Sequence, residues 1–178
     1  MRELSLNILD IAQNSIAAKA SLIEISVIEE EGKMKIIISD NGCGMDKEIV
    51  HQVQNPFFTT RTTRKVGMGI PLFKMAAEMT GGNFTIESSP GKGTRIEAIF
   101  NTKSIDFIPL GDISETIILL ITCNPHKDFV YAYSRNNYSF IFDTREIKEQ
   151  LQDIPLSTPE VVSWIKKYIK GKMDSYKN

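Results

Sequence analysis

The stretch Asp40–Met45, with the sequence DNGCGM, follows a run of apolar and β-branched residues at Met34–Ser39. That run predicts a strand, so we expect Asp40 at the end of a strand, where side chains face a crevice of the sheet. A carboxylate there can accept a hydrogen bond from the exocyclic amine of a base, while Gly42 and Gly44 allow a ligand to approach the backbone. An Asp-Asn-Gly sequence also forms a simple turn, and taken alone this stretch favours the turn.

A helix is predicted upstream, over about residues 3–20, because apolar residues recur there at helical spacing. Asp10 and Asn14 lie one turn apart in this helix and would present two oxygen atoms on one face. Mg²⁺ takes one or two protein oxygens together with phosphate oxygens, so this pair suits a cation held beside a nucleotide. Asp10 could instead be a base that orients a water molecule. Taken alone, such a polar pair is more often a solvated helix edge.

Two further glycine-rich stretches follow. Thr59–Gly69 supplies hydroxyl groups, basic side chains and then two glycines at the start of a predicted helix, whose free N–H groups would attract phosphate. Gly91–Thr94 joins two predicted strands and places a hydroxyl group at the start of the second. A solvated basic loop and a plain hairpin turn explain these stretches when each is taken alone. The patterns GxxxxGK[ST] and strand-linked GxGxxG are absent from the sequence, which excludes a P-loop and a Rossmann-type site.

The order of the expected elements predicts the fold class. Over residues 3–101 we expect a helix, a strand pair, a short helix with a loop, a helix and a second strand pair. This order favours an α+β fold, a two-layer α/β sandwich in which a mixed sheet carries helices on one face. After residue 103 the sequence predicts a helix, a strand pair and two more helices. We therefore expect two domains, residues 1–103 and a small α/β C-terminal extension at 104–178, which could recognise a partner, cover the sheet or pack against a second copy.

Composition narrows the class of protein. The chain has 178 residues, is 42% hydrophobic and carries a net charge of −1, so it can form a core and lacks the basic excess of nucleic-acid-binding proteins. Its longest apolar run, Ile117–Ile121, is too short to span a membrane. Polar residues near the N-terminus interrupt the apolar stretch that a signal peptide would need. We therefore expect a cytoplasmic protein with no membrane span and no nucleic-acid partner.

Taken together, the ordered stretches resemble the GHKL superfamily, which includes DNA gyrase B subunits, mismatch-repair ATPases, heat-shock chaperones and sensor histidine kinases. Residues 10–18 (DIAQNSIAA) resemble its N-box, Asp40–Met45 its G1 box and residues 67–72 (GMGIPL) its G2 box. Residues 56–61 (PFFTTR) and 88–94 (SSPGKGT) are similar to the lid and the final turn of histidine kinases. The resemblance covers about residues 3–101 and implies a Bergerat-type ATP site, because four ordered motifs together outweigh the separate simpler interpretations.

The resemblance implies roles for individual residues. Asn14 would hold Mg²⁺, and Asp40 would bind the adenine amine with support from Thr94. Arg61 and Lys65 are candidates for contact with the γ-phosphate. The complete set of residues implied to bind ATP is Asn14, Asp40, Gly42, Gly44, Met45, Thr60, Arg61, Lys65, Gly67, Met68, Gly69 and Thr94.

Three departures from the family pattern bear on activity. The ATPases of the family carry Glu where this chain has Asp10, so Asp10 is either a catalytic base that is one methylene shorter or a second Mg²⁺ ligand. Pro71 stands where the G2 box usually has glycine and would stiffen the end of the lid, residues 46–68. The chain starts in the N-box helix, and neither His51 nor His126 lies in the helical context of a phosphoacceptor histidine. We therefore do not expect histidine autophosphorylation in cis.

The sequence thus predicts a Mg²⁺-dependent ATP-binding protein that phosphorylates or regulates an unidentified partner protein in trans, as anti-sigma serine kinases do. One alternative is a binding module in which ATP changes the affinity for a partner without phosphoryl transfer. Another is a slow ATPase whose cycle drives dimerisation, for which the partner would be a second copy of the chain in a homodimer.

Overall fold

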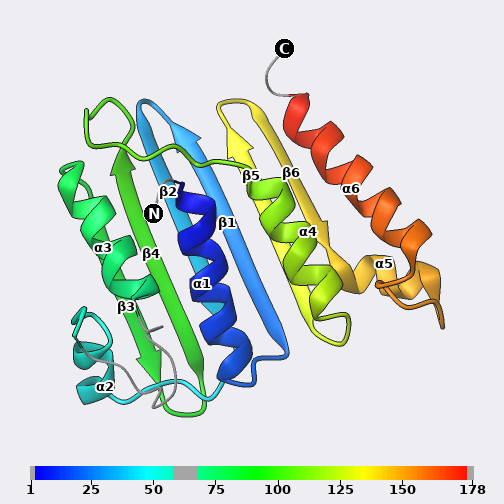
Figure 1. Ribbon diagram of the computed structural model, residues 1–178, viewed down its shortest axis with the longest axis horizontal. Helices are drawn as coiled ribbons and strands as arrows, with labels where there is room; N and C mark the ends of the chain where they lie inside the picture. The colour runs from blue at the N-terminus through cyan, green and yellow to red at the C-terminus, as the bar shows by residue number, and fades with distance from the viewer. Residues whose placement is uncertain (1–2, 58–67, 176–178) are drawn as a thin grey trace.

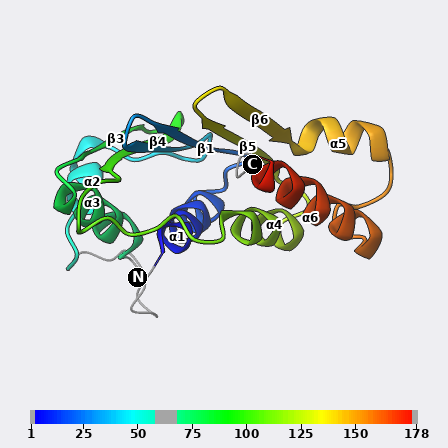
Figure 2. The same ribbon diagram turned by 90° about the horizontal axis from the view of Figure 1, so that it is seen from above.

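The computed structural model describes residues 3–57 and 68–175, which form a six-stranded sheet with helices packed on one face (Figure 1, Figure 2). Neighbouring strands follow the order β3-β4-β2-β1-β5-β6. The strands are β1 (Leu22–Glu30), β2 (Lys33–Asp40), β3 (Asn83–Ser89), β4 (Gly93–Asn101), β5 (Asp128–Arg135) and β6 (Tyr138–Asp143). The helices are α1 (Leu4–Ala17), α2 (Lys47–Gln52), α3 (Gly69–Met79), α4 (Ile113–Cys123), α5 (Thr144–Leu151) and α6 (Pro159–Asp174). The expected α+β class is confirmed.

Three hairpins build this sheet. The pairs β1–β2, β3–β4 and β5–β6 are antiparallel, and β4 also pairs with β2 in an antiparallel manner. The third hairpin joins the sheet through β5, which pairs with β1 in a parallel manner. In this pairing Leu22 lies opposite Asp128 and Glu29 lies opposite Arg135. The sheet is therefore mixed, as expected, and the parallel pair is formed between segments far apart in the chain.

The core lies between the sheet and the layer of α1, α3, α4 and α6 (Figure 2). Alternate residues of β1, namely Ile23, Ile25 and Val27, are buried on the helix side of the sheet, as the period of a half-covered strand requires. Phe73 of α3 packs against Phe100 of β4 with ring centroids 5.4 Å apart. Within the described residues, no helix combines the length and the apolar character that crossing a membrane requires.

Residues beyond 103 continue both layers. Besides the β1–β5 pairing, the backbone N–H groups of Leu4 and Ser5 at the start of α1 donate to the carbonyl oxygens of Pro109 and Leu110, at 2.9 and 2.8 Å. The hydroxyl of Thr116 in α4 donates to the carbonyl oxygen of Ser5 at 3.4 Å. The sheet and the helix layer are thus continuous across the expected boundary, and the division into domains 1–103 and 104–178 stays a prediction.

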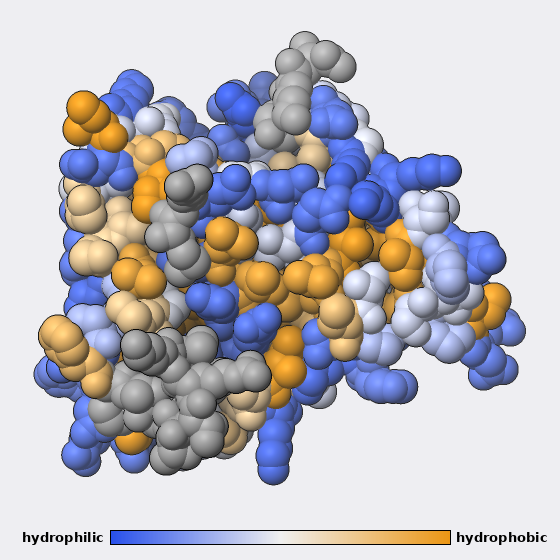
Figure 3. Space-filling view, viewed as in Figure 1, coloured by the Kyte–Doolittle hydropathy of each residue, from blue (hydrophilic) through white to orange (hydrophobic). Residues whose placement is uncertain are grey.

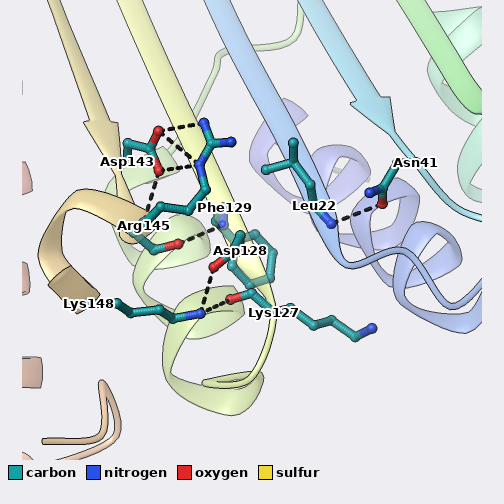
Figure 4. Close-up of polar contacts among 9 residues, drawn as sticks. Leu22, Asn41, Lys127, Asp128, Phe129, Asp143, Arg145 and Lys148 are labelled. Atoms are coloured by element: carbon teal, nitrogen blue, oxygen red, sulfur yellow. Dashed lines mark hydrogen bonds and ion pairs between the residues drawn. The ribbon is translucent and has the colours of Figure 1, made fainter. Parts of the chain in front are cut away.

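Polar contacts fix the start of β5 at the end of the sheet where β1 also starts (Figure 4). The Lys148 ammonium group of α5 donates to Oδ1 of Asp128 at 2.7 Å and to the carbonyl oxygen of Lys127 at 2.9 Å. The N–H group of Phe129 donates to the buried hydroxyl of Thr144 at 2.9 Å. These bonds hold α5 against the first residues of β5.

Candidate nucleotide-binding site

Asp40, the last residue of β2, has its carboxylate held by two donors. The hydroxyl of Ser15 in α1 donates to Oδ2 at 2.6 Å, and the N–H group of Gly42 donates to Oδ1 at 2.8 Å. Ser15 is buried, at 4% exposure, so the first bond forms where water has little access. A carboxylate has about four lone-pair positions, which leaves each oxygen able to accept a further hydrogen bond from a ligand.

Thr94 lies directly opposite Asp40 in the β2–β4 register. Its hydroxyl is 2.9 Å from that of Ser88, and the Ser88 hydroxyl donates to the carbonyl oxygen of Gly93 at 2.8 Å. A hydroxyl has one hydrogen, and that of Ser88 is already used, so Thr94 is the donor to Ser88. In this network both Asp40 and Thr94 have lone pairs with which to accept hydrogen bonds from a ligand.

The G1-box loop is anchored at both ends by side chains. The N–H group of Met45 donates to the Ser88 hydroxyl at 2.8 Å, which ties the loop to β3. The amide oxygen of Asn41 accepts from the N–H groups of Ser21 and Leu22 at 2.9 and 3.0 Å, which ties it to the start of β1 (Figure 4). These bonds hold the loop beside the end of the sheet.

The loop glycines allow backbone segments to pack against each other. Gly44 and Gly93 have positive φ angles of 67° and 86°. A Cβ atom on Gly44 would lie 1.9 Å from the carbonyl oxygen of Ser89, and one on Gly93 would lie 1.9 Å from that of Asp40. Any side chain at either position would therefore separate the G1-box loop from the β3–β4 hairpin.

Asp10 and Asn14 are half-buried on α1, one turn apart, and Asn14 directly precedes Ser15. Asp10 lies against the start of α3, because a Cβ atom on Gly69 would be 2.8 Å from the Cβ atom of Asp10. A carboxylate and an amide oxygen at this spacing form a donor set that fits Mg²⁺ bound jointly with phosphate oxygens. Among residues 3–57 and 68–175, no group of three or more His, Cys, Asp or Glu side chains could hold a metal ion.

The structure therefore brings together five of the predicted site residues, Asp40, Gly42, Gly44, Met45 and Thr94. Asn14 precedes Ser15, the donor to Asp40, on α1. Met68 is the N-cap residue of α3, and Gly69, its first residue, lies beside Asp10. Thr60, Arg61, Lys65 and Gly67 lie outside the described residues.

Two further residues support the site without having been assigned a role from the sequence. Ser15 orients Asp40, and Ser88 orients Thr94 and Met45. The signal for Ser15 is its position among the buried residues of α1, since a serine on an apolar helix face needs a hydrogen-bond partner. The identity of that partner, Asp40, depends on a tertiary contact and cannot be predicted from the hydrophobic pattern of the helix.

Comparison with known proteins agrees with this geometry. The family model described as "Histidine kinase-, DNA gyrase B-, and HSP90-like ATPase" matches residues 1–104, which is more than half of the chain. The chain belongs to this family. It is a histidine-kinase-like ATP-binding domain within residues 1–104, as the resemblance of its motifs implied.

The curated relatives of this domain are longer proteins. The cell-division control histidine kinase PdhS of Brucella abortus (strain S19) is 28% identical over 113 residues, and that of Brucella canis (strain ATCC 23365 / NCTC 10854 / RM-666) is 30% identical over 113 residues. Each match covers 56% of this chain but 11% of the relative, so the chain spans a small part of the length of these kinases.

A solved structure described as the N-terminal domain of a DNA repair protein shares the fold, with a TM-score of 0.57 at 14% sequence identity. The match covers 79% of this chain and 52% of that chain. Because the family model covers only 104 of the 178 residues, this structural likeness includes part of the C-terminal region.

Proposed function

We propose that the chain binds ATP with Mg²⁺ at the end of the sheet beside Asp40 and phosphorylates or regulates a partner protein in trans. The observation that carries the nucleotide part is the pair Asp40 and Thr94, which are adjacent in the register and can both accept hydrogen bonds from a ligand. Adenine presents an amine at its 6-position, whereas guanine presents a carbonyl oxygen there. The Asp40 carboxylate can accept a hydrogen bond from this adenine amine, and the ATPase family to which the chain belongs favours adenine as the base.

Asn14 and Asp10 are the residues that would hold Mg²⁺ beside the phosphates. Their oxygens project from the same helix that carries Ser15, the donor to Asp40. When bound, Mg²⁺ would neutralise phosphate charge. Asp10 of α1 is also the candidate base, because it lies beside the start of α3, where a nucleotide's phosphates would meet uncapped backbone N–H groups.

Transfer to a partner is supported by the kinase relatives and by the surface of the helix layer. Apolar side chains gather on that face over α1 and α4, where Leu6 and Leu119 are 42% and 46% exposed (Figure 3). Contiguous exposed apolar residues are typical of protein contact sites. The cytoplasmic location and the homodimer expected from the sequence stay predictions.

The experiment is incubation of the purified chain with γ-labelled ATP and Mg²⁺, with and without an extract of the source cells. Label transferred to an extract protein by the wild-type chain, and lost with Asp40→Asn, supports the kinase proposal. Asn at this position turns an amide N–H₂ group toward Ser15 or Gly42, both donors, so ATP binding should weaken by about ten- to a hundredfold. Release of free phosphate without transfer indicates the slow ATPase instead, and ATP binding without turnover indicates the binding module.

A further inference from the structure

A cavity lies between α2, α3 and β3, and the residues predicted to contact ATP do not line it. Its volume is about 700 Å³, within the range of small-molecule sites. The described residues that line it come from α2 and the segment after it, from α3 and from the sheet edge, namely Lys47, Val50, His51, Gln54, Asn55, Lys74, Ile86, Glu87, Ser88 and Ser89. Five of them, at positions 47–55, fall within the predicted lid, residues 46–68, but none belongs to the residues predicted to contact ATP.

The lining combines basic groups with an apolar floor. Lys47 and His51 line it from α2, and Lys74 lines it from α3. Val50 and Ile86 supply the apolar part, and Ile86 also packs against the core. Three basic side chains around an apolar floor are the chemistry that recognises an anionic group on an apolar body.

The acidic residue in the wall does not cancel this character. Glu87 follows Ile86 in β3, so its side chain points to the opposite face of the sheet, where Arg95 lies opposite it in the register. The ammonium group of Lys74 donates to Gln54 at 3.1 Å and is 4.0 Å from the carboxylate of the half-exposed Glu78. Such a long and solvated ion pair contributes little, so Lys74 keeps most of its attraction for an anion.

We propose that this cavity is a second ligand site, which takes a small organic anion, a carboxylate or phosphate group carried on an apolar body. The two sources of the anionic group share the same recognition chemistry, because lysine ammonium groups bind either as point charges.

The cavity shares a wall with the candidate nucleotide site. Ser88 lines the cavity, accepts from the N–H group of Met45 and lies 2.9 Å from the hydroxyl of Thr94. α2 begins directly after the G1-box loop, where Asp46 accepts from the N–H group of Ile49 at 2.9 Å and caps it. A ligand that bridges α2, α3 and β3 would hold the start of the predicted lid in place. This coupling rests on the proposed ATP function, and we expect it to raise ATP affinity at least about fivefold.

The two histidines of the chain provide the test. His51 lines the cavity, whereas His126 lies in the turn between α4 and β5, so their imidazole NMR signals report cavity and background in one sample. The probes are isophthalate and phenyl phosphate, added to nucleotide-free protein, with neutral isophthalamide as the matched control compound. Saturable movement of the His51 signal by at least one of the two anions, with His126 and the isophthalamide sample unchanged, supports the site. If only one of the two anions moves the His51 signal, that result shows whether the site takes a carboxylate or a phosphate group.

Variants make the test specific. Lys74→Gln is expected to lower the affinity for the anion at least about tenfold, since it removes a charge-assisted contact. Lys167→Gln on α6 is expected to leave that affinity unchanged. Lys47 is exposed, so Lys47→Gln can replace Lys74→Gln in the test if the latter fails to fold. It too should weaken binding of the anion. Equal movement of both histidine signals, or binding unaffected by these substitutions, overturns the proposal. Movement caused only by a pentaglutamate peptide also overturns it, because it assigns the cavity to a protein partner.

The two proposals can fail separately. The histidine signals are recorded without nucleotide, so a missing ATP site leaves that result intact. The coupling is read from the affinity of ATP with and without the bound anion. An unchanged affinity would keep the second site but remove its regulatory role.

Discussion

Replacing Ser15 by Ala tests whether the orientation of Asp40 governs nucleotide affinity. The change removes one buried hydroxyl group and with it the 2.6 Å bond to Oδ2, while the bond from Gly42 to Oδ1 remains. Asp40 is half-buried, so water can replace part of the lost bond. We expect the free energy of unfolding to fall by about 1.5 kcal/mol, the lower end of the range for a hydrogen bond to a charged group.

The larger consequence is for binding. Without Ser15, the carboxylate of Asp40 can turn about its side-chain bonds, and binding must immobilise it again. Ordering one side chain costs about 0.5–1.5 kcal/mol, which corresponds to a loss of about two- to twelvefold in ATP affinity. Isothermal titration with ATP and Mg²⁺ measures this, and thermal unfolding measures the stability.

The matched control is Ser114→Ala, which removes another buried helical hydroxyl, in α4 and away from the site. It should leave ATP affinity unchanged. If Ser15→Ala binds ATP as tightly as the wild-type chain does, or if both variants lose the same affinity, Asp40 is not oriented by Ser15 for binding and the reasoning fails.

Four more outcomes are expected. Thr94→Val should weaken ATP binding by about 1 kcal/mol, as titration of the wild-type chain and the variant with ATP would show. Gly93→Ala should lower the melting temperature sharply, because its Cβ atom would meet the carbonyl oxygen of Asp40 at 1.9 Å, and an unchanged melting temperature would contradict the close loop packing. Deleting residues 104–178 should give an aggregating product, since β1 loses its parallel partner, and a soluble, ATP-binding fragment would show that residues 1–103 fold alone. Hydrogen bonds from Lys170 and Lys166 lower the pKa of Glu115 below its ordinary value of 4.5, so its stabilising contribution is complete above that pH and is lost as pH falls through the lower folded pKa. The free energies of unfolding of the wild-type chain and Glu115→Gln should therefore differ at pH values above 4.5 and converge at pH values below the folded pKa of Glu115.

The sequence allowed much of the site to be predicted because its parts are local. The position of Asp40 at a strand end follows from the apolar and β-branched run before it, and the hairpin that carries Thr94 follows from its turn residues. The resemblance of the ordered motifs then joined these parts into one ATP site, and the family match confirms the kind of domain.

The remaining features depend on tertiary contacts. The bond from Ser15 to Asp40 joins residues 25 positions apart, and no local pattern specifies it. The parallel pairing of β5 with β1 could not be predicted either, because hydrophobic periodicity identifies a strand but not its neighbour. The cavity beside α2 arises only when α2, α3 and β3 meet. The contributions of Thr60, Arg61, Lys65 and Gly67 stay predictions.

The parallel pair also has a consequence for how the chain is made. β1 becomes a central strand only after β5 has left the ribosome, about 100 residues later, which takes roughly 5–20 s at the usual speed of synthesis. Until then the edge of β1 and the side of α1 that later packs on α4 are open to other chains. Nascent protein should therefore depend on chaperones during this interval, and substitutions that slow the formation of β5 should lower the yield of folded protein more than its final stability.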